Sequence, residues 1–253
     1  MLREMLRAVR VLACPLLGAA CGGRDAGPPI PIPGYTPGAP GLGAHAIAFQ
    51  RYRDLMNLPV LTTPPMTTAP GSTIIVAVGR GDVTAHAPPT DTLGNPPARQ
   101  LGETHTYTSW PKSGTALYAL TATAAGAGHT VRATTPHADE ITLAAVEVRE
   151  GGRVEAVAWN EVLDGSPLRS RSVTTTGPAT LIAVWWGDGA YLRHDKTAVP
   201  DSGFAVVDAV LSAGELVQCA VAVKNVSEAG TYDVTWQATP HQGAQLWLVA
   251  VQK

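Results

Sequence analysis

Turn-forming residues interrupt this chain at short intervals from about Ala46 to the C-terminus. Runs of β-branched and small apolar residues, separated by Gly, Pro, Asp or Asn, recur about every 8 to 14 residues, close to the strand spacing of sandwiches and barrels. Only 49–58 fits either one short helix or a first strand, and no other segment has a long 3.6-residue period. The sequence therefore predicts an all-β antiparallel sandwich.

The strongest strand signal is the alternation from Thr231 to Gln237, which places Tyr232, Val234 and Trp236 on one face. The other predicted strands are 72–79, 103–109, 115–122, 128–134, 140–148, 153–159, 168–175, 179–186, 204–211, 215–223 and 244–252. The composition agrees, since the chain has 26 glycines, 21 prolines and only 15% charged residues, against roughly 25% in an ordinary soluble domain.

The two halves of the sequence resemble each other. The run 68–82 aligns with 174–188, and a Thr-Pro-His sequence at 135–137 and again at 239–241 precedes a strand in each half. The repeat is too long for a solenoid unit, so it indicates either two halves of one sandwich or two small β-domains. Because each half offers only five or six predicted strands, we expect one jelly-roll-like sandwich with a continuous core over 44–253.

The duplication predicts which positions are equivalent. The expected counterparts are 72–79 and 179–186, 140–148 and 244–252, His129 and Tyr232, and Ala133 and Trp236. Each pair should occupy related places in the sandwich and face the same side of its sheet, because a shift by one residue along a strand reverses the face.

Residues 1–20 have the features of a secretory signal peptide. Three arginines precede an apolar run from Val11 to Ala20, which is too short to cross a bilayer as a helix. The end of this run, Leu-Gly-Ala-Ala-Cys, resembles the lipobox of bacterial lipoproteins, in which the cysteine is diacylated and becomes the mature N-terminus. We expect a lipid on Cys21; ordinary cleavage after Ala20, which leaves a free cysteine, is the alternative.

Residues 21–43 are rich in proline and glycine, a composition that stays extended and buries little surface. We expect this segment to tether the domain to its lipid. Cys14 leaves with the signal peptide, so Cys219 is the only cysteine inside the domain and cannot form an intramolecular disulfide there. Its strand pattern predicts a small buried side chain on the face of Val217 and Val221.

Several of these runs resemble β-sandwich modules of secreted bacterial and phage-tail-associated proteins. The resemblance covers about Thr67 to Gln252, and it is carried by Ser172–Val184, the turn Asp91–Asn95, the strand Gly230–Trp236 and the closing run Leu246–Val251. Such modules are non-catalytic, and most have no assigned activity. The resemblance therefore implies a fold and an exported location more than a function.

A Trp-Trp-Gly-Asp-Gly run that begins at Trp185 is the sharpest candidate for a ligand site. Adjacent strand residues face opposite sides, so one tryptophan should enter the core. The repeat pairs Trp186 with Arg80, and because arginine is an unlikely core residue we expect Trp186 to be exposed. With Tyr191 as a second aromatic and Asp188 as polar partner, Trp186 would stack on a sugar ring. A pair of packing tryptophans at a sheet edge is the alternative.

Signals for metal binding and catalysis are weak. The histidines considered as zinc ligands show no close ligand spacing; they are His86, His105, His129, His137, His194 and His241. Asp188, Asp195 and Asp201 fall within the long loop 187–203, where they would bind calcium, serve a hydrolase or remain solvated. The chain has no nucleophile elbow, phosphate loop or zinc-protease motif. We expect no metal or other cofactor and no catalysis.

The sequence predicts a binding or interaction module anchored by lipid in the bacterial cell envelope. Its expected partner is a glycan or another envelope component, and its only expected membrane contact is the N-terminal lipid. A net charge of -2 argues against a nucleic-acid partner, because no basic excess is present to displace counterions. Two other classes stay open: an extracellular hydrolase that uses loop carboxylates, and a structural subunit of an envelope or fibre assembly.

Overall fold

The computed structural model describes residues 39–50, 60–81, 87–134, 140–187, 194–212 and 218–253. All regular structure in these ranges is β-strand, and every pairing between strands is antiparallel, which confirms the predicted all-β sandwich. Within these residues, no helix is long and apolar enough to span a membrane.

The first half of the chain forms a sandwich of one large and one small sheet. Its strands are β1 (Gly41–Gln50), β2 (Val60–Thr62), β3 (Ser72–Arg80), β4 (Thr90–Asp91), β5 (Arg99–Thr106), β6 (Gly114–Ala122), β7 (Val131–Thr134) and β8 (Ile141–Arg149). The large sheet has the order β1-β8-β3-β6-β5 and the small sheet the order β2-β7-β4. Except for the hairpin β5–β6 within the large sheet, successive strands alternate between the two sheets, which is typical of a jelly roll.

The second half repeats this arrangement strand for strand. Its strands are β9 (Arg153–Val162), β10 (Leu168–Arg169), β11 (Val173–Thr175), β12 (Ala179–Gly187), β13 (Thr197–Pro200), β14 (Ala205–Val210), β15 (Cys219–Val226), β16 (Gly230–Tyr232), β17 (Thr235–Thr239) and β18 (Ala244–Gln252). The large sheet runs β9-β18-β12-β15-β14 and the small sheet β10-β17-β13, with β11 and β16 as an additional pair. The predicted duplication is confirmed, because β3 and β12 are both central strands and β8 and β18 are both their neighbours.

The strand register confirms the predicted residue pairs as well. Ala133 lies opposite a leucine of β2, and Trp236 lies opposite a leucine of β10. The isolated bridge made by His129 occupies the place of the β11–β16 pairing made by Tyr232. Ala133, Trp236 and His129 are buried, and Tyr232 packs partly buried against the apolar core of the second half.

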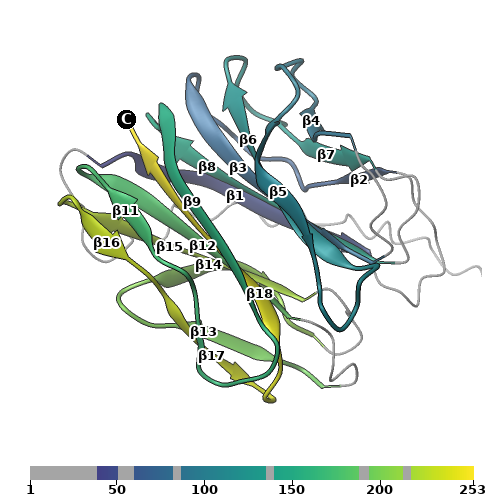
Figure 1. The fold of residues 1–253 in the computed structure, drawn as a ribbon. Helices are drawn as coiled ribbons and strands as arrows, with labels where there is room; N and C mark the ends of the chain where they lie inside the picture. Colours follow the sequence, from purple (N-terminus) through teal and green to yellow (C-terminus); the bar gives the residue numbers. More distant parts are fainter. Residues whose placement is uncertain (1–38, 51–59, 82–86, 135–139, 188–193, 213–217) are drawn as a thin grey trace, which may run out of the picture.

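Four β-layers follow one another in the molecule, from β2, β4 and β7 to β13 and β17 (Figure 1). Each half encloses its own apolar core between its large and small sheets. A third cluster, here called the interface cluster, joins the two large sheets; its buried members are Ile75, Ala77, Leu101, Leu117, Ala144, Val146, Val148, Ile182, Val184, Trp186, Val207, Cys219, Val221, Val223, Trp247, Val249 and Val251. The expectation of one continuous core was wrong, because each half is a complete sandwich. The sequence pattern did not predict the short strands β2, β4 and β13, so each half was expected to have too few strands for a core of its own.

The two large sheets approach each other closely at Gly79 and Trp186. A Cβ atom at Gly79 would overlap the Trp186 indole, so only glycine lets this side chain fit. Gly79 is the last but one residue of β3, and Trp186 is the last but one residue of β12. Equivalent positions of the two halves therefore face each other across the interface, which means that the halves are related by an approximate two-fold axis.

The sequence alignment of Trp186 with Arg80 was wrong by one residue. Since side chains alternate along a strand, this error reversed the predicted face. Trp186 is fully buried in the interface cluster, and Trp185 is fully buried on the opposite side of the sheet, in the core of the second half. Arg80 is 2% exposed, and burial lowers the pKa of its guanidinium to about 10, so the expectation that an arginine would avoid the core was also wrong.

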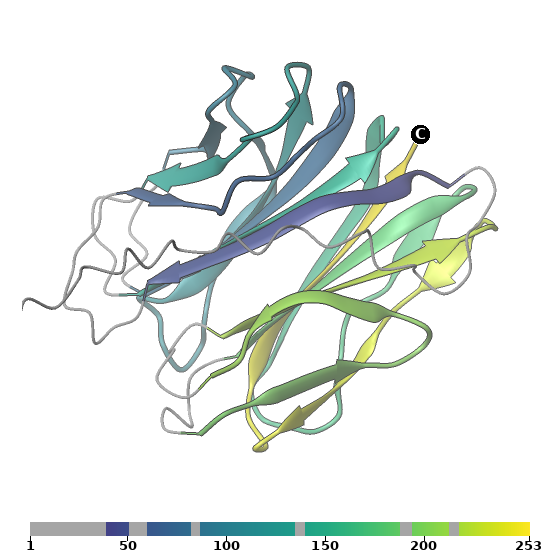
Figure 2. The ribbon, with the colours of Figure 1, turned by 180° about the vertical axis from the view of Figure 1, so that it is seen from behind.

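The two ends of the sandwich are distinct. β1 begins and β18 ends on the same side, as both views of the ribbon show (Figures 1 and 2). There the Thr180 hydroxyl donates a hydrogen bond to the carbonyl of Pro40, directly before β1. We call this side the anchor end, and the opposite side, where β3 and β12 finish, the loop end. Because β1 starts at Gly41, residues 41–43 belong to a strand and not to the expected tether over 21–43.

We expect Trp186→Ala to lower the free energy of unfolding by about 3–5 kcal/mol, because the substitution removes an indole from the centre of the interface cluster. Urea denaturation followed by circular dichroism measures the change. The matched control is Trp110→Ala, which truncates a half-exposed tryptophan and should change stability by about 0.5 kcal/mol or less. A loss below about 1 kcal/mol for Trp186→Ala would contradict its place in the core.

Candidate functional site

The ligand site predicted from the sequence does not form around Trp186. Its indole is enclosed between the two large sheets, so it offers no face to a sugar. The alternative of two packing tryptophans describes the pair better, although both lie in cores rather than at a sheet edge. Asp188 and Tyr191, and the lipidation candidate Cys21, lie outside the described residues.

A different tryptophan is exposed at the loop end. Trp110 lies in the connection between β5 and β6 and is 50% exposed. The connection is closed by three backbone hydrogen bonds, from Tyr107 N to Ser113 O at 2.9 Å, from Trp110 N to Tyr107 O at 3.3 Å and from Ser113 N to Trp110 O at 2.8 Å. The sequence analysis missed this residue, although a Ser-Trp-Pro run between two predicted strands was a visible signal.

The second half of the chain braces this connection where it leaves β5, through Tyr107 and Thr108. The Tyr107 hydroxyl, which is buried, lies 3.1 Å from the carbonyl oxygen of Trp186 and 3.0 Å from that of Gly187. Thr108 donates two hydrogen bonds to the carboxylate of Glu161 on β9, from its backbone N at 2.8 Å and from its hydroxyl at 2.6 Å. Trp110 is therefore held on a fixed loop, which reduces the entropy lost when a ligand binds.

An aromatic cluster lies along β5, next to the braced loop. The His105 ring stacks on Trp159 of β9, with centroids 3.6 Å apart and planes 4° from parallel. Trp247 of β18 lies against the same histidine and donates from Nε1 to the Thr115 hydroxyl at 2.8 Å. Burial lowers the pKa of His105, against a smaller opposing effect of Glu103. The stack thus favours the neutral imidazole and couples β5 to the second half.

The histidines that the structure describes do not assemble a metal site. His86 and His137 lie outside the described residues, and among the described ones no three His, Cys, Asp or Glu side chains converge as metal ligands would. The buried His129 has the inward position expected from the repeat, with Nδ1 2.7 Å from the Thr68 hydroxyl and Nε2 3.0 Å from an Asp91 carboxylate oxygen. All three side chains are buried, so this hydroxyl–imidazole–carboxylate chain has no access to a ligand. It holds the segments that carry Thr68, Asp91 and His129 together.

The acidic residues of the loop 187–203, as far as the structure describes them, do not converge as a calcium or hydrolase site would require. Asp195 precedes β13 and Asp201 follows it, so the strand separates them. Asp201 also accepts a hydrogen bond from Thr235 N at 2.8 Å. Cys219 is fully buried beside Val221 in the interface cluster, and burial raises the pKa of its thiol, so the prediction of a packing cysteine is confirmed.

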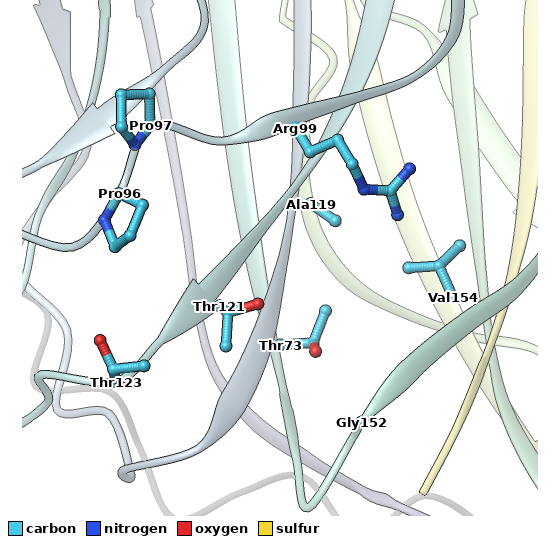
Figure 3. A pocket seen from close by; sticks show the side chains of 9 residues that line it. All are labelled: Thr73, Pro96, Pro97, Arg99, Ala119, Thr121, Thr123, Gly152 and Val154. Atoms are coloured by element: carbon cyan, nitrogen blue, oxygen red, sulfur yellow. The ribbon is translucent and has the colours of Figure 1, made fainter.

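A pocket of about 280 Å³ opens toward the anchor end, at the junction of the two halves (Figure 3). Its lining residues come from β3, β5, β6 and β9, and from the connections before β5, after β6 and before β9. They are Thr73, Pro96, Pro97, Arg99, Ala119, Thr121, Thr123, Gly152 and Val154. This volume is near the lower limit of small-molecule sites.

Comparisons with protein families, curated proteins and solved structures find no match to this chain. The resemblance to secreted and phage-tail-associated sandwich modules therefore stays a prediction. The geometry of the loop end and of the anchor-end pocket is the basis on which function can be argued.

We expect His105→Phe to make stability less dependent on pH. Because His105 releases its proton more readily in the folded protein than in the unfolded chain, the wild type should lose stability as the pH falls from about 6.5 through the lower folded pKa. Phenylalanine keeps the stack on Trp159 and removes the titration. Urea midpoints at pH 7.5 and 5.0 measure the effect, and identical pH dependence in both proteins would contradict it.

Proposed function

We propose that this protein is a binding module of the bacterial cell surface, anchored at one end of its sandwich and binding a glycan at the other. The observation that carries the proposal is the half-exposed Trp110 on a braced loop, at the end of the molecule opposite to the start of β1. A fixed exposed indole is the side chain that stacks most favourably on the apolar face of a sugar ring.

The surroundings of Trp110 suit such a ligand. Ser109 and Lys112, on either side of it, are exposed and offer hydrogen-bond donors to sugar hydroxyls. In the sequence Asp188 directly follows Gly187, whose carbonyl oxygen accepts from Tyr107. Asp188, the polar partner predicted from the sequence, is thus the next residue in the chain after Gly187, which braces the Trp110 loop.

The proposed anchor is a lipid on Cys21, followed by the proline- and glycine-rich tether. An extended segment of this length and composition would reach on the order of 50 Å. Since the described chain enters the sandwich at the anchor end, this arrangement would direct Trp110 away from the membrane surface. Glycans of the surroundings would then be the accessible ligands.

We expect Trp110→Ala to remove most glycan binding without unfolding the protein, because an exposed indole provides stacking area but fills no core cavity. A glycan array probed with the purified wild type identifies the ligand, and titration calorimetry with that ligand then compares the variants. The matched control is Val199→Ala, which shortens another exposed apolar side chain, on β13. Equal affinity of Trp110→Ala and wild type would reject Trp110 as the platform.

We expect the protein expressed in a bacterial host to fractionate with membranes, because Cys21 would carry lipid. Cys21→Ser should release the protein or block its processing, as fractionation followed by mass spectrometry would show. A soluble mature wild type with an unmodified Cys21 would contradict the anchor.

A further inference from the structure

Arg99 is a cation at the rim of the anchor-end pocket, and no described carboxylate pairs with it. It lies on the edge strand β5, and its guanidinium extends over Ala119 toward Val154 of β9 (Figure 3). Arg99 is exposed, so its guanidinium is open to a ligand, and two parallel N–H donors fit the two oxygens of a carboxylate.

Hydroxyl groups line the pocket beside this cation. Thr121 makes no side-chain hydrogen bond with any described residue, so its hydroxyl is available to a ligand. Thr73 and Thr123 donate their protons within the protein, to Gly151 O and to the Asn95 side-chain oxygen at 2.8 Å, and keep lone pairs that can accept. The pocket thus offers both donors and acceptors, as a polyhydroxylated ligand requires.

The remaining lining is apolar and small. Pro96 and Pro97 lie across the pocket from Arg99, and Ala119 and Val154 form the wall beneath its guanidinium (Figure 3). Both proline rings are exposed and offer apolar C–H surface to the C–H face of a sugar. A volume of about 280 Å³ has room for one sugar ring and not for a longer chain buried as a whole.

The duplication shows that Arg99 is not needed to build the sandwich. By strand register, the residue of β14 that corresponds to Arg99 of β5 is Ala205. The counterpart of Thr121 is Asn225, which is bonded to Thr180 at 2.8 Å, whereas Thr121 is left open. The two halves share one architecture, but only the first carries a cation and an open hydroxyl at this place.

We propose that the pocket binds a single acidic sugar residue, a hexuronate, with its carboxylate on Arg99 and its hydroxyls on the threonines. Gly152 and Val154 belong to the second half and all other lining residues to the first, so the site exists only when the two halves are packed together. It lies at the opposite end from Trp110 and does not depend on glycan stacking there.

The test is titration of the purified full chain with D-glucuronate, using D-glucose and acetate as probes that lack either the carboxylate or the sugar ring. Glucuronate should bind and should exceed both probes in affinity at least tenfold. Arg99→Gln should lower its affinity about tenfold to a hundredfold, because a charge-assisted hydrogen-bond pair is lost. Thr121→Val should give a smaller loss, and both variants should keep the urea midpoint of the wild type.

Two control variants make the result specific. Arg132→Gln removes an exposed arginine on β7, away from the pocket, and should leave the affinity for glucuronate unchanged. Trp110→Ala should also leave it unchanged, so this experiment is independent of the proposed stacking site. Absence of glucuronate binding, equal binding of glucose or acetate, or full affinity in Arg99→Gln would each overturn the proposal.

Discussion

The packing of the two large sheets against each other is the interaction on which the rest of the structure depends. Because the halves are related by an approximate two-fold axis, positions near that axis meet their own counterparts. If positions 79 and 186 both held tryptophan, the two indoles would overlap. If both held glycine, a cavity would remain between the sheets. The Trp186 indole fills the space that the missing side chain of Gly79 leaves open. The duplicated halves therefore differ at this position, although their strand order is the same.

Both candidate sites are consequences of this packing. The Trp110 loop belongs to the first half but is fixed by carbonyl groups at the end of β12 and by Glu161 of β9. The anchor-end pocket is closed on one side by Gly152 and Val154, where the second half begins. Binding sites that bridge packed units are common because the junction supplies concave, rigid surfaces that neither unit has alone. Separation of the halves would therefore abolish both sites.

The sequence predicted the strands and the duplication because both depend on local patterns of turn residues and alternating side chains. It predicted one strand over 231–237 where the chain forms β16 and β17, with Val234 and Trp236 inward as expected. The candidate site failed because a single-residue alignment error decides which face a strand residue occupies. Long-range contacts were also invisible: Glu147 is fully buried and accepts hydrogen bonds from Ala44 N, Ala69 N and the Ser72 hydroxyl, partners distant in the sequence.

The two halves should unfold as one cooperative unit, because the interface cluster joins their large sheets. Native-state hydrogen exchange followed by mass spectrometry tests it most directly, because it resolves the opening free energy of each strand. We expect amides of β3 and β12 to exchange only through global unfolding, with the same free energy and the same dependence on denaturant. Exchange of one large sheet at low denaturant while the other stayed protected would show instead that the halves unfold as independent domains.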